Sequence, residues 1–422
     1  MGEIVVRRET CRGCGSSRVD LSLPLAKVPV VSPNVGTGAD GGRLHSVIAP
    51  LDNYLCRDCG LIQLLHVVDP SLIYRNYLYR TAVSLGLGQH FRTLAEAVAR
   101  RLALAPGDLV VEFGSNDGTL LGVFKEQGQR VRGVDPARQI AEEASARGIP
   151  TRADFFNEAV AREIRAQAGP ARAILSNNVL ANVDDVGAVL RGVKELLAPS
   201  GCFVFETQYA LDVFDKFLLD VIYHEHVSCF SVKPVDLMLP RFGLEIVDAE
   251  RIATKGGSIR IWAQHRGGAL ARARAVDDLI ALEERSGLYD LARHRRLAER
   301  VQASKAALHA MIAAEKVEGG DVAGFGTSVG CAALIHQFEL EDKLSALYDD
   351  KPFKDWIEGP GYSLPIRHGD ELDTAPPGLL IILAWRYADD IMRRHRAYLE
   401  RGGRALVVLP EIRLIEKEVR PS

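Results

Sequence analysis

Short apolar runs separated by segments of helical pattern fill residues 74–235. Apolar runs of strand length that alternate with helices are typical of a parallel sheet buried on both faces. We therefore predict an α/β domain over residues 73–268. Its parallel strands are expected at residues 109–113, 131–135, 173–176 and 202–206.

Two further apolar runs, at residues 244–249 and 258–263, flank the turn Lys255-Gly256-Gly257. Consecutive glycines favour a turn, so these runs are predicted to be adjacent strands. Such a pair would close the sheet with an antiparallel edge.

The last third of the chain predicts a connector and a second domain. Residues 270–316 carry Ala, Leu, Arg and Glu at helical spacing without proline, which predicts two long helices as a connector over residues 269–316. Apolar runs return at residues 320–326, 379–384 and 404–409. They predict a second α/β domain over residues 317–422.

The first 72 residues differ in character, with short strands, turns, a Gly-rich stretch at residues 36–42 and two cysteine pairs. Each pair has the spacing Cys-x-x-Cys, which presents two thiolates to one tetrahedral ion. A redox dithiol is the alternative, but two pairs about forty residues apart favour a closed structural zinc site. The expected ligands are Cys11, Cys14, Cys56 and Cys59. Cys202, Cys229 and Cys331 stand alone and are expected to be buried apolar residues.

Composition narrows the class of ligand. The chain of 422 residues has 52 Lys plus Arg against 55 Asp plus Glu, a formal net charge of -3. Nucleic acid is a poor candidate substrate, because its phosphates favour a basic surface. No apolar run approaches the ~20 residues that span a bilayer. The N-terminus lacks the features of a secretory signal, so we expect a cytoplasmic protein that acts on a small molecule.

The run at residues 109–113 leads into the turn Glu112-Phe113-Gly114-Ser115-Asn116-Asp117-Gly118. Glycines let backbone approach a ligand closely, and a helix start presents unpaired amides. The turn lacks the third glycine of a dinucleotide site and the Lys of a phosphate loop. Asp135, at the next strand end, is placed to accept the ribose hydroxyls of an adenosine. Asp154 and Phe155 offer a polar group and an aromatic face for adenine.

Several motifs together resemble the zinc-containing, S-adenosylmethionine-dependent sugar C-methyltransferases, the deoxysugar C-3 methyltransferases of the tetronitrose and mycarose type. The resemblance spans nearly the whole chain and is looser after residue 320. Its motifs are the cysteine pairs, the turn at residues 112–118, Tyr77-Leu78-Tyr79-Arg80, Asn177-Asn178-Val179-Leu180-Ala181-Asn182, Tyr223-His224-Glu225-His226, Gly256-Gly257-Ser258 and Ala384-Trp385-Arg386-Tyr387-Ala388.

The resemblance implies S-adenosylmethionine as methyl donor, a structural zinc ion and a nucleotide-linked 4-keto sugar as acceptor. It also implies a small zinc-binding module, a class I Rossmann-like methyltransferase domain and a C-terminal Rossmann-like domain that helps to hold the nucleotide. The expected donor-binding residues are Glu112, Gly114, Asn116, Gly118, Asp135, Asp154, Phe155, Asn177 and Asn178. The expected substrate-binding residues are Tyr79, Asn182, Lys255, Gly326 and Ser328.

Methylation of a carbon requires a base, because the carbon attacks only after losing a proton, and a partner for the enolate oxygen. Tyr223 and His226 would share one face of a helix, whereas His224 would point elsewhere. His226 is the candidate base, oriented by Glu225 or another carboxylate. Tyr223 and Tyr77 are candidate partners of the enolate oxygen. The resemblance carries all four residues over individually.

Two departures from the family pattern concern the acceptor. Asn182 stands where relatives commonly have histidine, and an amide takes no proton at neutral pH. The turn at residues 324–331 keeps its glycines but lacks a basic residue, although helix-start amides hold phosphate without one. An O- or N-methyltransferase of another small metabolite, and a non-catalytic protein that binds S-adenosylmethionine, therefore stay open as alternatives.

Overall fold

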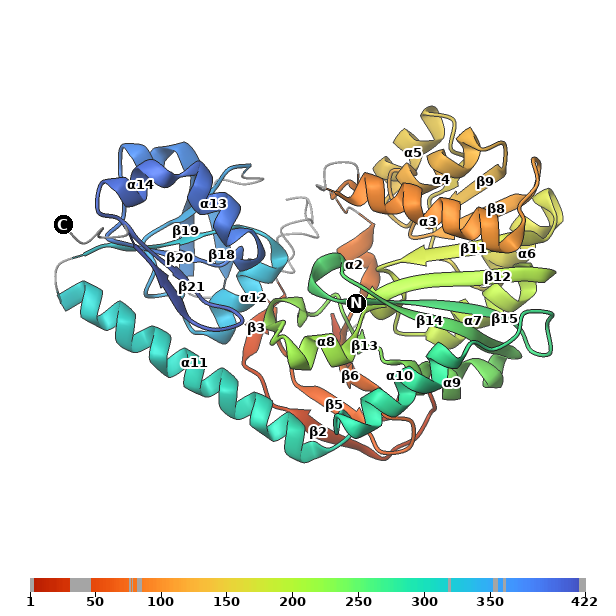
Figure 1. Ribbon diagram of the computed structural model, residues 1–422, viewed down its shortest axis with the longest axis horizontal. Helices are drawn as coiled ribbons and strands as arrows, with labels where there is room; N and C mark the ends of the chain where they lie inside the picture. The colour runs from red at the N-terminus through yellow and green to blue at the C-terminus, as the bar shows by residue number, and fades with distance from the viewer. Residues whose placement is uncertain are drawn as a thin grey trace.

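The computed structural model describes residues 4–30, 47–75, 77, 79–81, 86–317, 320–351, 356–359 and 362–416. The Gly-rich stretch at residues 36–42 and Leu78 of the tyrosine motif lie outside this part of the chain. Figure 1 shows a C-terminal domain on one side, a larger central domain on the other, and the N-terminal strands beneath the central domain.

The N-terminal region forms a four-stranded antiparallel sheet in the order β13-β6-β5-β2. Its strands are β2 (Val19–Leu23), β5 (Asn53–Cys56), β6 (Ile62–Leu64) and β13 (Ser228–Cys229). The flanking elements are β1 (Val5–Arg7), β3 (Lys27–Pro29), β4 (Ile48–Pro50), β7 (His66–Val68) and α2 (Pro70–Tyr74). Because β13 comes from the central part of the chain, backbone hydrogen bonds join the N-terminal region to the central domain.

The central domain contains a seven-stranded sheet in the order β10-β9-β8-β11-β12-β15-β14. The first five strands are parallel, whereas β15 is antiparallel to β12 and β14 is antiparallel to β15. The strands are β8 (Leu109–Phe113), β9 (Arg130–Val134), β10 (Thr151–Arg152), β11 (Ala171–Asn177), β12 (Leu197–Gln208), β14 (Leu244–Ile252) and β15 (Ser258–His265). The predicted parallel sheet with an antiparallel edge is confirmed.

Helices cover both faces of this sheet because alternate strand residues point in opposite directions. Val110 packs with the helices α3 and α4, and its neighbour Val111 packs with α6 and α7 on the other face. The helices are α3 (Leu87–Leu102), α4 (Thr119–Glu126), α5 (Arg138–Ala146), α6 (Glu158–Ala168) and α7 (Val186–Leu196). The result is a three-layer α/β domain with its parallel strands fully buried.

Short elements connect the strands of the central domain. They are η2 (Leu180–Asn182), α8 (Ala210–Asp215), η3 (Leu219–Val221), α9 (Val232–Met238), η4 (Leu239–Phe242) and η5 (Thr254–Gly256). Two of them carry residues singled out from the sequence, Asn182 in η2 and Lys255 in η5.

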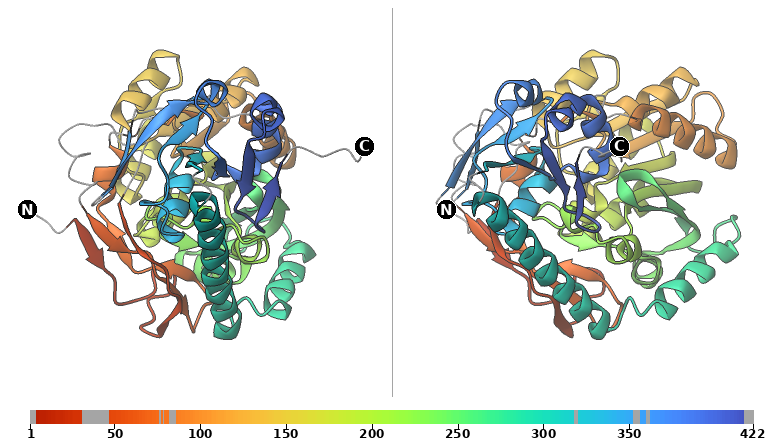
Figure 2. Two further views of the ribbon diagram at one scale, coloured as in Figure 1. Left: turned by 90° about the vertical axis from the view of Figure 1, so that its left-hand side faces the viewer. Right: turned by 60° about the vertical axis from the view of Figure 1, so that its left-hand side comes forward.

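Two helices, α10 (Arg274–Arg285) and α11 (Leu291–Val317), follow the central domain. Figure 2 shows α11 passing along the N-terminal strands toward the C-terminal domain, in agreement with its contacts to β2 and β16. In the part of the chain described, no helix is long and apolar enough to cross a bilayer.

The C-terminal domain has a seven-stranded sheet in the order β18-β19-β17-β16-β20-β21-β22. Its five inner strands are parallel, and β18 and β22 are antiparallel edges. The strands are β16 (Val322–Phe325), β17 (Leu347–Asp349), β18 (Trp356–Gly359), β19 (Tyr362–His368), β20 (Leu379–Ile382), β21 (Arg404–Val407) and β22 (Arg413–Ile415). The helices are α12 (Val329–Gln337), η6 (Gly369–Asp373), η7 (Trp385–Tyr387), α13 (Ala388–Arg394) and α14 (Arg396–Glu400).

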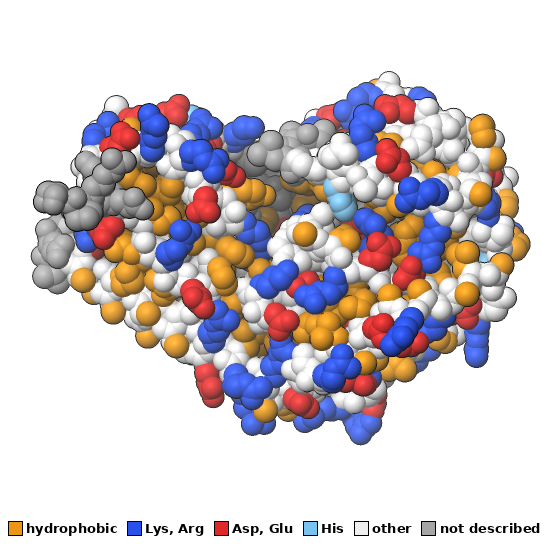
Figure 3. Space-filling view, in the orientation of Figure 1, with side chains coloured by type: hydrophobic (Ala, Val, Ile, Leu, Met, Phe, Trp, Pro, Cys, Tyr) orange, Lys and Arg blue, Asp and Glu red, His pale blue; other side chains and the backbone are white. Residues whose placement is uncertain are grey.

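The C-terminal domain contacts the central domain through α12 and η7. The Arg386 guanidinium pairs with the Asp220 carboxylate at 2.6 Å. A Cβ on Gly330 would lie 2.7 Å from the carbonyl oxygen of Asp220, so only glycine fits there without displacement. Figure 3 shows a notch between these two domains on one face of the molecule.

A buried carboxylate anchors α10 to the central domain. The Glu283 side chain accepts four hydrogen bonds, from the hydroxyls of Tyr209 (2.9 Å) and Tyr289 (2.5 Å) and from the backbone amides of Val232 (2.6 Å) and Lys233 (3.0 Å). The two amides belong to the first turn of α9, whose donors would otherwise be unsatisfied. Glu283 therefore joins three segments at one point.

We expect Glu283→Ala to lower the free energy of unfolding by about 3 kcal/mol, because it leaves buried donors without an acceptor. Urea denaturation measures the change. Glu284→Ala is the matched control, because Glu284 is 51% exposed and makes only a surface pair with Lys233. That control should change stability by less than about 0.5 kcal/mol. Equal effects of the two substitutions would contradict the anchoring role.

Candidate active site and zinc centre

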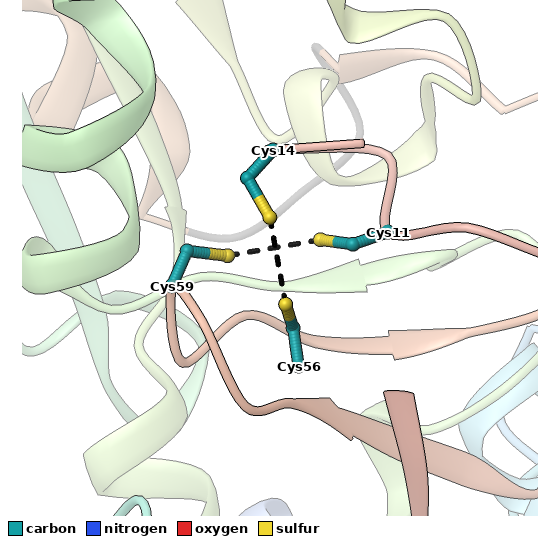
Figure 4. Close-up of side chains that lie close together, drawn as sticks. All are labelled: Cys11, Cys14, Cys56 and Cys59. Atoms are coloured by element: carbon teal, nitrogen blue, oxygen red, sulfur yellow. Dashed lines mark hydrogen bonds between the residues drawn. The ribbon is translucent and has the colours of Figure 1, made fainter. Parts of the chain in front are cut away.

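The four cysteines of the Cys-x-x-Cys pairs converge at one point (Figure 4). Their sulfur atoms all lie within 4.8 Å of one another. The Sγ atoms of Cys11 and Cys59 are 3.7 Å apart, and those of Cys14 and Cys56 are 3.5 Å apart. A tetrahedral ion with Zn–S bonds of about 2.3 Å separates its sulfurs by about 3.8 Å. The cluster therefore fits a structural zinc ion held by four thiolates.

A cavity of about 720 Å³ lies at the carboxyl ends of the parallel central strands. Ligands of open α/β sheets bind at this edge, and the volume lies in the range of small-molecule pockets. The N-terminal region closes part of it with Arg8 and with residues of β1, β7 and α2, including Tyr74. Among the residues that the structure describes, none after Lys255 lines the cavity.

The turn after β8 is shaped by its glycines. Gly114 has a φ of 66°, and a Cβ there would lie 2.1 Å from a methyl of Val179. Gly118 has a φ of 76°, and a Cβ there would lie 2.9 Å from a methyl of Ile149. Only glycine tolerates both the conformation and the close approach. Gly114 lines the cavity, whereas Gly118 lies outside its wall and starts α4.

Asp135 follows β9 and lines the cavity beside Gly114. Its Oδ2 accepts from the Asn116 amide (2.8 Å) and its Oδ1 from the Ala137 amide (2.9 Å), which fixes the carboxylate. Burial raises the pKa of Asp135 to about 6, despite these two hydrogen bonds. The carboxylate is therefore mostly ionised at neutral pH and retains free lone pairs.

The side chains of two residues expected to bind the methyl donor contact other parts of the protein. Asn116 lines the cavity, but its side chain accepts from the Thr81 amide (2.9 Å) and donates to the Tyr79 carbonyl (2.9 Å). Glu112 is buried outside the cavity wall, where its Oε1 accepts from Asn177 Nδ2 (3.2 Å). Burial raises the pKa of Glu112 well above its usual range. Asn116 thus holds a wall segment, and Glu112 orients Asn177.

Unsatisfied acceptors show that the cavity suits a polar ligand. The Oδ1 atoms of Asn177 and Asn178, both in the cavity wall, are buried without a hydrogen-bond partner within the described chain. Buried polar atoms in native proteins are normally paired with protein, water or ligand. The amino and hydroxyl groups of S-adenosylmethionine are donors of the kind that these acceptors need.

Asp154 and Phe155 also line the cavity. Asp154 Oδ1 accepts from the Phe155 amide at 2.9 Å, and the carboxylate pairs with Arg152 at 3.2 Å. The Arg75 guanidinium lies 5.1 Å from the centre of the Phe155 ring. One face of the ring is therefore covered by a cation.

The segment from Tyr223 to His226 is a turn, so the prediction of a shared helix face is wrong. The turn is closed by a hydrogen bond from the His226 amide to the Tyr223 carbonyl (2.9 Å). It nevertheless brings the two side chains together, with ring centres 4.1 Å apart and a hydroxyl to Nε2 distance of 3.1 Å. His224 points away, and its Nε2 lies 3.3 Å from the Ala49 carbonyl oxygen.

His226 is held as one neutral tautomer. Its Nδ1 lies 2.8 Å from the Val221 carbonyl oxygen, which can only accept and so favours a proton on Nδ1, and 2.6 Å from the Gln208 amide nitrogen. Its Nε2 is then an acceptor for the Tyr223 hydroxyl. A backbone carbonyl, and not the expected carboxylate, orients the ring. Burial lowers the pKa of His226 to about 3, so the ring is neutral at physiological pH.

Glu225 points into the same cavity as His226 and accepts from the Tyr77 hydroxyl at 3.3 Å. Its backbone carbonyl accepts from the Tyr74 hydroxyl at 3.2 Å. Lys255 reaches the cavity from the turn before β15. Burial, with a smaller contribution from Arg386, lowers the pKa of Lys255 to about 8, so it remains mainly a cation at pH 7.

The remaining predicted substrate residues divide between two places. Tyr79 and Asn182 line the cavity, and Asn182 Oδ1 is buried without a partner in the described chain. Gly326 and Ser328 lie outside the cavity wall, in the C-terminal domain. Gly326 has a φ of 116°, and Ser328 caps α12 by accepting from the Cys331 amide (3.3 Å).

Sequence reasoning missed three residues near the site. Gln208 is 5% exposed at the end of β12, and its Nε2 lies 2.9 Å from His226 Nε2. Tyr74 contacts Glu225, and Asp220 anchors Arg386. Glu206 and Gln208 are polar residues on one face of the end of a buried strand. This pattern was the sequence signal that could have identified Gln208.

Three family models together match most of the chain. A zinc binding domain matches residues 11–74, a methyltransferase domain matches residues 87–249, and a C-methyltransferase C-terminal domain matches residues 253–410. The fold and these matches define an S-adenosylmethionine-dependent methyltransferase with a zinc-binding domain.

The chain belongs to the C-methyltransferase family that includes C-methyltransferase NovU of Streptomyces niveus. The two are 32% identical over 419 residues, which cover 99% of each chain. The family methylates carbon, which decides against the oxygen, nitrogen and non-catalytic alternatives.

Solved structures match the chain over less than half of its length. Magnesium protoporphyrin IX methyltransferase from Synechocystis PCC 6803, with bound SAM, is 15% identical, covering 43% of this chain and 80% of that chain with a TM-score of 0.33. The CcbJ methyltransferase from Streptomyces caelestis is 15% identical, covering 42% of this chain and 89% of that chain with a TM-score of 0.32.

We expect the purified protein to contain one zinc ion per chain, because four thiolates complete a tetrahedral site. Elemental analysis measures the metal. Cys56→Ser should lose it, because three thiolates no longer close the site. Cys331→Ala is the control and should keep it, since Cys331 lies in the C-terminal domain. Zinc retained by Cys56→Ser, or a disulfide within either pair, would contradict the assignment.

Proposed function

We propose that the protein transfers a methyl group from S-adenosylmethionine to C-3 of a nucleotide-linked 4-keto-deoxysugar. The observation that carries this proposal is a single cavity lined by both the Gly114 turn with Asp135 and the Tyr223–His226 turn. A carbon beside a ketone becomes a nucleophile after a base removes its proton. The cavity offers a neutral imidazole for that step.

The donor occupies the part of the cavity at the ends of β8 and β9. Its ribose hydroxyls donate to Asp135, and the Gly114 backbone lets the donor approach the sheet. Phe155 and Asp154 take the adenine, and Asn177 and Asn178 accept from the polar groups of the donor. When bound, S-adenosylmethionine supplies an electrophilic methyl group on a sulfonium. Glu112 contributes to donor binding indirectly, because it orients Asn177. Asn116 does so because it holds the segment 79–81 in the cavity wall.

His226 Nε2 removes the proton from the acceptor carbon. In the structure this atom faces both the Tyr223 hydroxyl and the Gln208 amide nitrogen, so both donors must turn away from Nε2 first. The ketone oxygen of the substrate is an acceptor to which the Tyr223 hydroxyl can turn, and that rotation would stabilise the enolate. Burial disfavours the imidazolium, and the negative enolate beside it offsets that cost.

The position and charge of other residues suggest how they contact the sugar substrate. Lys255 is a cation at the cavity, suited to the enolate oxygen or to the phosphates of the nucleotide. The Tyr77 hydroxyl donates to Glu225 in the structure and would turn to the same oxygen to stabilise it, and Tyr79 and Asn182 position the sugar. The C-terminal domain, residues 317–422, binds the nucleotide beyond the cavity, with Gly326 and Ser328 at the start of α12.

Donor affinity should depend on Asp135 and on pH. Asp135→Ala is expected to weaken donor binding by about 1 to 3 kcal/mol, through loss of charge-assisted hydrogen bonds. The pKa of Asp135 is raised to about 6. Because the ionised carboxylate accepts from the ribose, affinity should be full above that pH and fall as the pH drops through it. Calorimetry between pH 5 and 8 measures both effects.

Asp135→Asn separates charge from shape in that experiment. It keeps the side-chain volume and should bind weakly with no inflection near pH 6. An unchanged affinity in Asp135→Ala, or the same inflection in Asp135→Asn, would place the ribose elsewhere.

His226→Asn is expected to lower turnover by ~10²- to 10⁴-fold, the usual effect of removing a general base, while donor affinity stays near normal. It should also stop exchange of the acidic proton of the acceptor with deuterated water in the absence of donor. Mass spectrometry follows both reactions, with a panel of nucleotide-linked keto sugars as acceptors.

His224→Asn is the control for that variant, because His224 lies in the same turn but faces Ala49. It should retain exchange and methylation. If His226→Asn exchanges the proton and methylates at close to the parent rate, the base is another residue. If no keto sugar is methylated by the parent protein, the acceptor class is wrong.

A further inference from the structure

One arginine between the zinc ligands, Arg12, contacts the segments that form the cavity wall. Arg12 lies between the ligands Cys11 and Cys14, and its side chain is 0% exposed. The guanidinium of an arginine stays charged at neutral pH in a protein. A buried guanidinium is stable only when its donors are satisfied, so its partners define what it does.

Two partners of Arg12 belong to the N-terminal sheet. Its Nη2 donates to the Leu64 carbonyl (2.8 Å), and Gln63 Oε1 accepts from both the backbone amide (3.1 Å) and Nη1 (3.4 Å) of Arg12. Gln63 and Leu64 lie in β6, the strand that pairs with β13. Arg12 is therefore fixed to the edge of the sheet that faces the central domain.

The other two partners belong to the central domain. Nη1 donates to the Val227 carbonyl, and Nη2 lies 3.3 Å from Asp184 Oδ1. Val227 directly follows His226, and Asp184 lies two residues after Asn182. Asp184, Asn182 and His226 all line the cavity. The planar guanidinium thus ties together the ends of two segments that form the cavity wall.

The second cysteine pair offers an internal comparison. Arg57 occupies the same position between Cys56 and Cys59, but its side chain is 46% exposed and pairs with Asp20 on the surface. An arginine between the two cysteines is therefore not buried by the geometry of the cluster itself. The burial of Arg12 follows from its contacts with the central domain.

We propose that Arg12 is a positioning residue that holds the His226 turn and the Asn182–Asp184 segment in place relative to the zinc cluster. The inference rests on the proposed role of His226. Arginine suits this task because its rigid fork serves several acceptors at once, which a lysine ammonium on a flexible stem does not reproduce. Displacement of a catalytic group by about 1 Å costs up to about 100-fold in rate.

The test compares Arg12→Lys with Arg57→Lys. We expect Arg12→Lys to keep its zinc and to bind donor within about twofold of the parent, while kcat falls by about 10- to 100-fold. Arg57→Lys should leave zinc, donor affinity and kcat unchanged. Elemental analysis, calorimetry and steady-state kinetics give these three quantities, and separate values of kcat and KM distinguish misplacement from weaker binding.

A measurement without acceptor separates this inference from the proposed reaction. Histidine-selective ¹⁵N labelling of the zinc-loaded, donor-bound protein reports the tautomer and hydrogen bonding of His226. Its resonances should shift in Arg12→Lys and stay in place in Arg57→Lys. This result is independent of which acceptor the enzyme methylates, and of whether His226 is the base.

A second pair of variants covers the case in which Arg12→Lys fails to fold or to bind zinc. Asp184→Ala removes one partner of Arg12 outside the cysteine cluster, and should shift the same resonances. Asp20→Ala, which removes the partner of Arg57, should not. Unmoved His226 resonances in Asp184→Ala, or in a folded Arg12→Lys, would overturn the proposal. A shift of equal size in the Arg57 or Asp20 variant would overturn it too.

Discussion

The backbone pairing of β13 with β6 joins the N-terminal region, which closes part of the cavity, to the central domain, which supplies the His226 turn. Ser228 and Cys229 pair with Gln63 and Ile62, and the Leu64 amide donates to the Val227 carbonyl at 2.9 Å. Because β13 starts two residues after His226, its register fixes where the His226 turn lies. A slip of one residue would turn the side chains of the strand to the opposite face. The zinc centre stabilises the sheet that supplies this register.

The cavity favours neutral forms of its ionisable groups. Burial lowers the pKa of His226 and Lys255 and raises that of Asp135 and Tyr223. Methyl transfer from a sulfonium cation to an enolate anion leaves two neutral products. A site that is poorly hydrated therefore disfavours the separate charges more than the transition state in which they cancel. In the proposed reaction, the same burial that weakens His226 as a base assists the transfer step.

The sequence predicted the elements that depend on local pattern. The parallel strands, the antiparallel edge and the cysteine cluster follow from apolar runs and from paired spacing. The helix expected for Tyr223 and His226 was wrong, because spacing of three residues fits a turn as well as a helix. The contact of Val221 with His226 and the burial of Arg12 depend on distant segments meeting in space. No local pattern records such tertiary contacts. The sequence therefore does not show that Arg12 is buried and Arg57 exposed, although both lie between the two cysteines of a pair.

Asn182 stands where relatives commonly have histidine, so the cavity has one titratable side chain fewer than the family pattern would provide. His226 and Lys255 are the two nitrogen bases of the cavity wall whose protonation is set by burial, and they differ in state at pH 7. His226, with a pKa of about 3, is neutral and can accept a proton, whereas Lys255, with a pKa of about 8, is mainly charged and cannot. Environments that separate two pKa values in this way assign different roles to the groups. In the proposed reaction, burial therefore suits His226 to the role of base and Lys255 to the role of cation, without a second histidine.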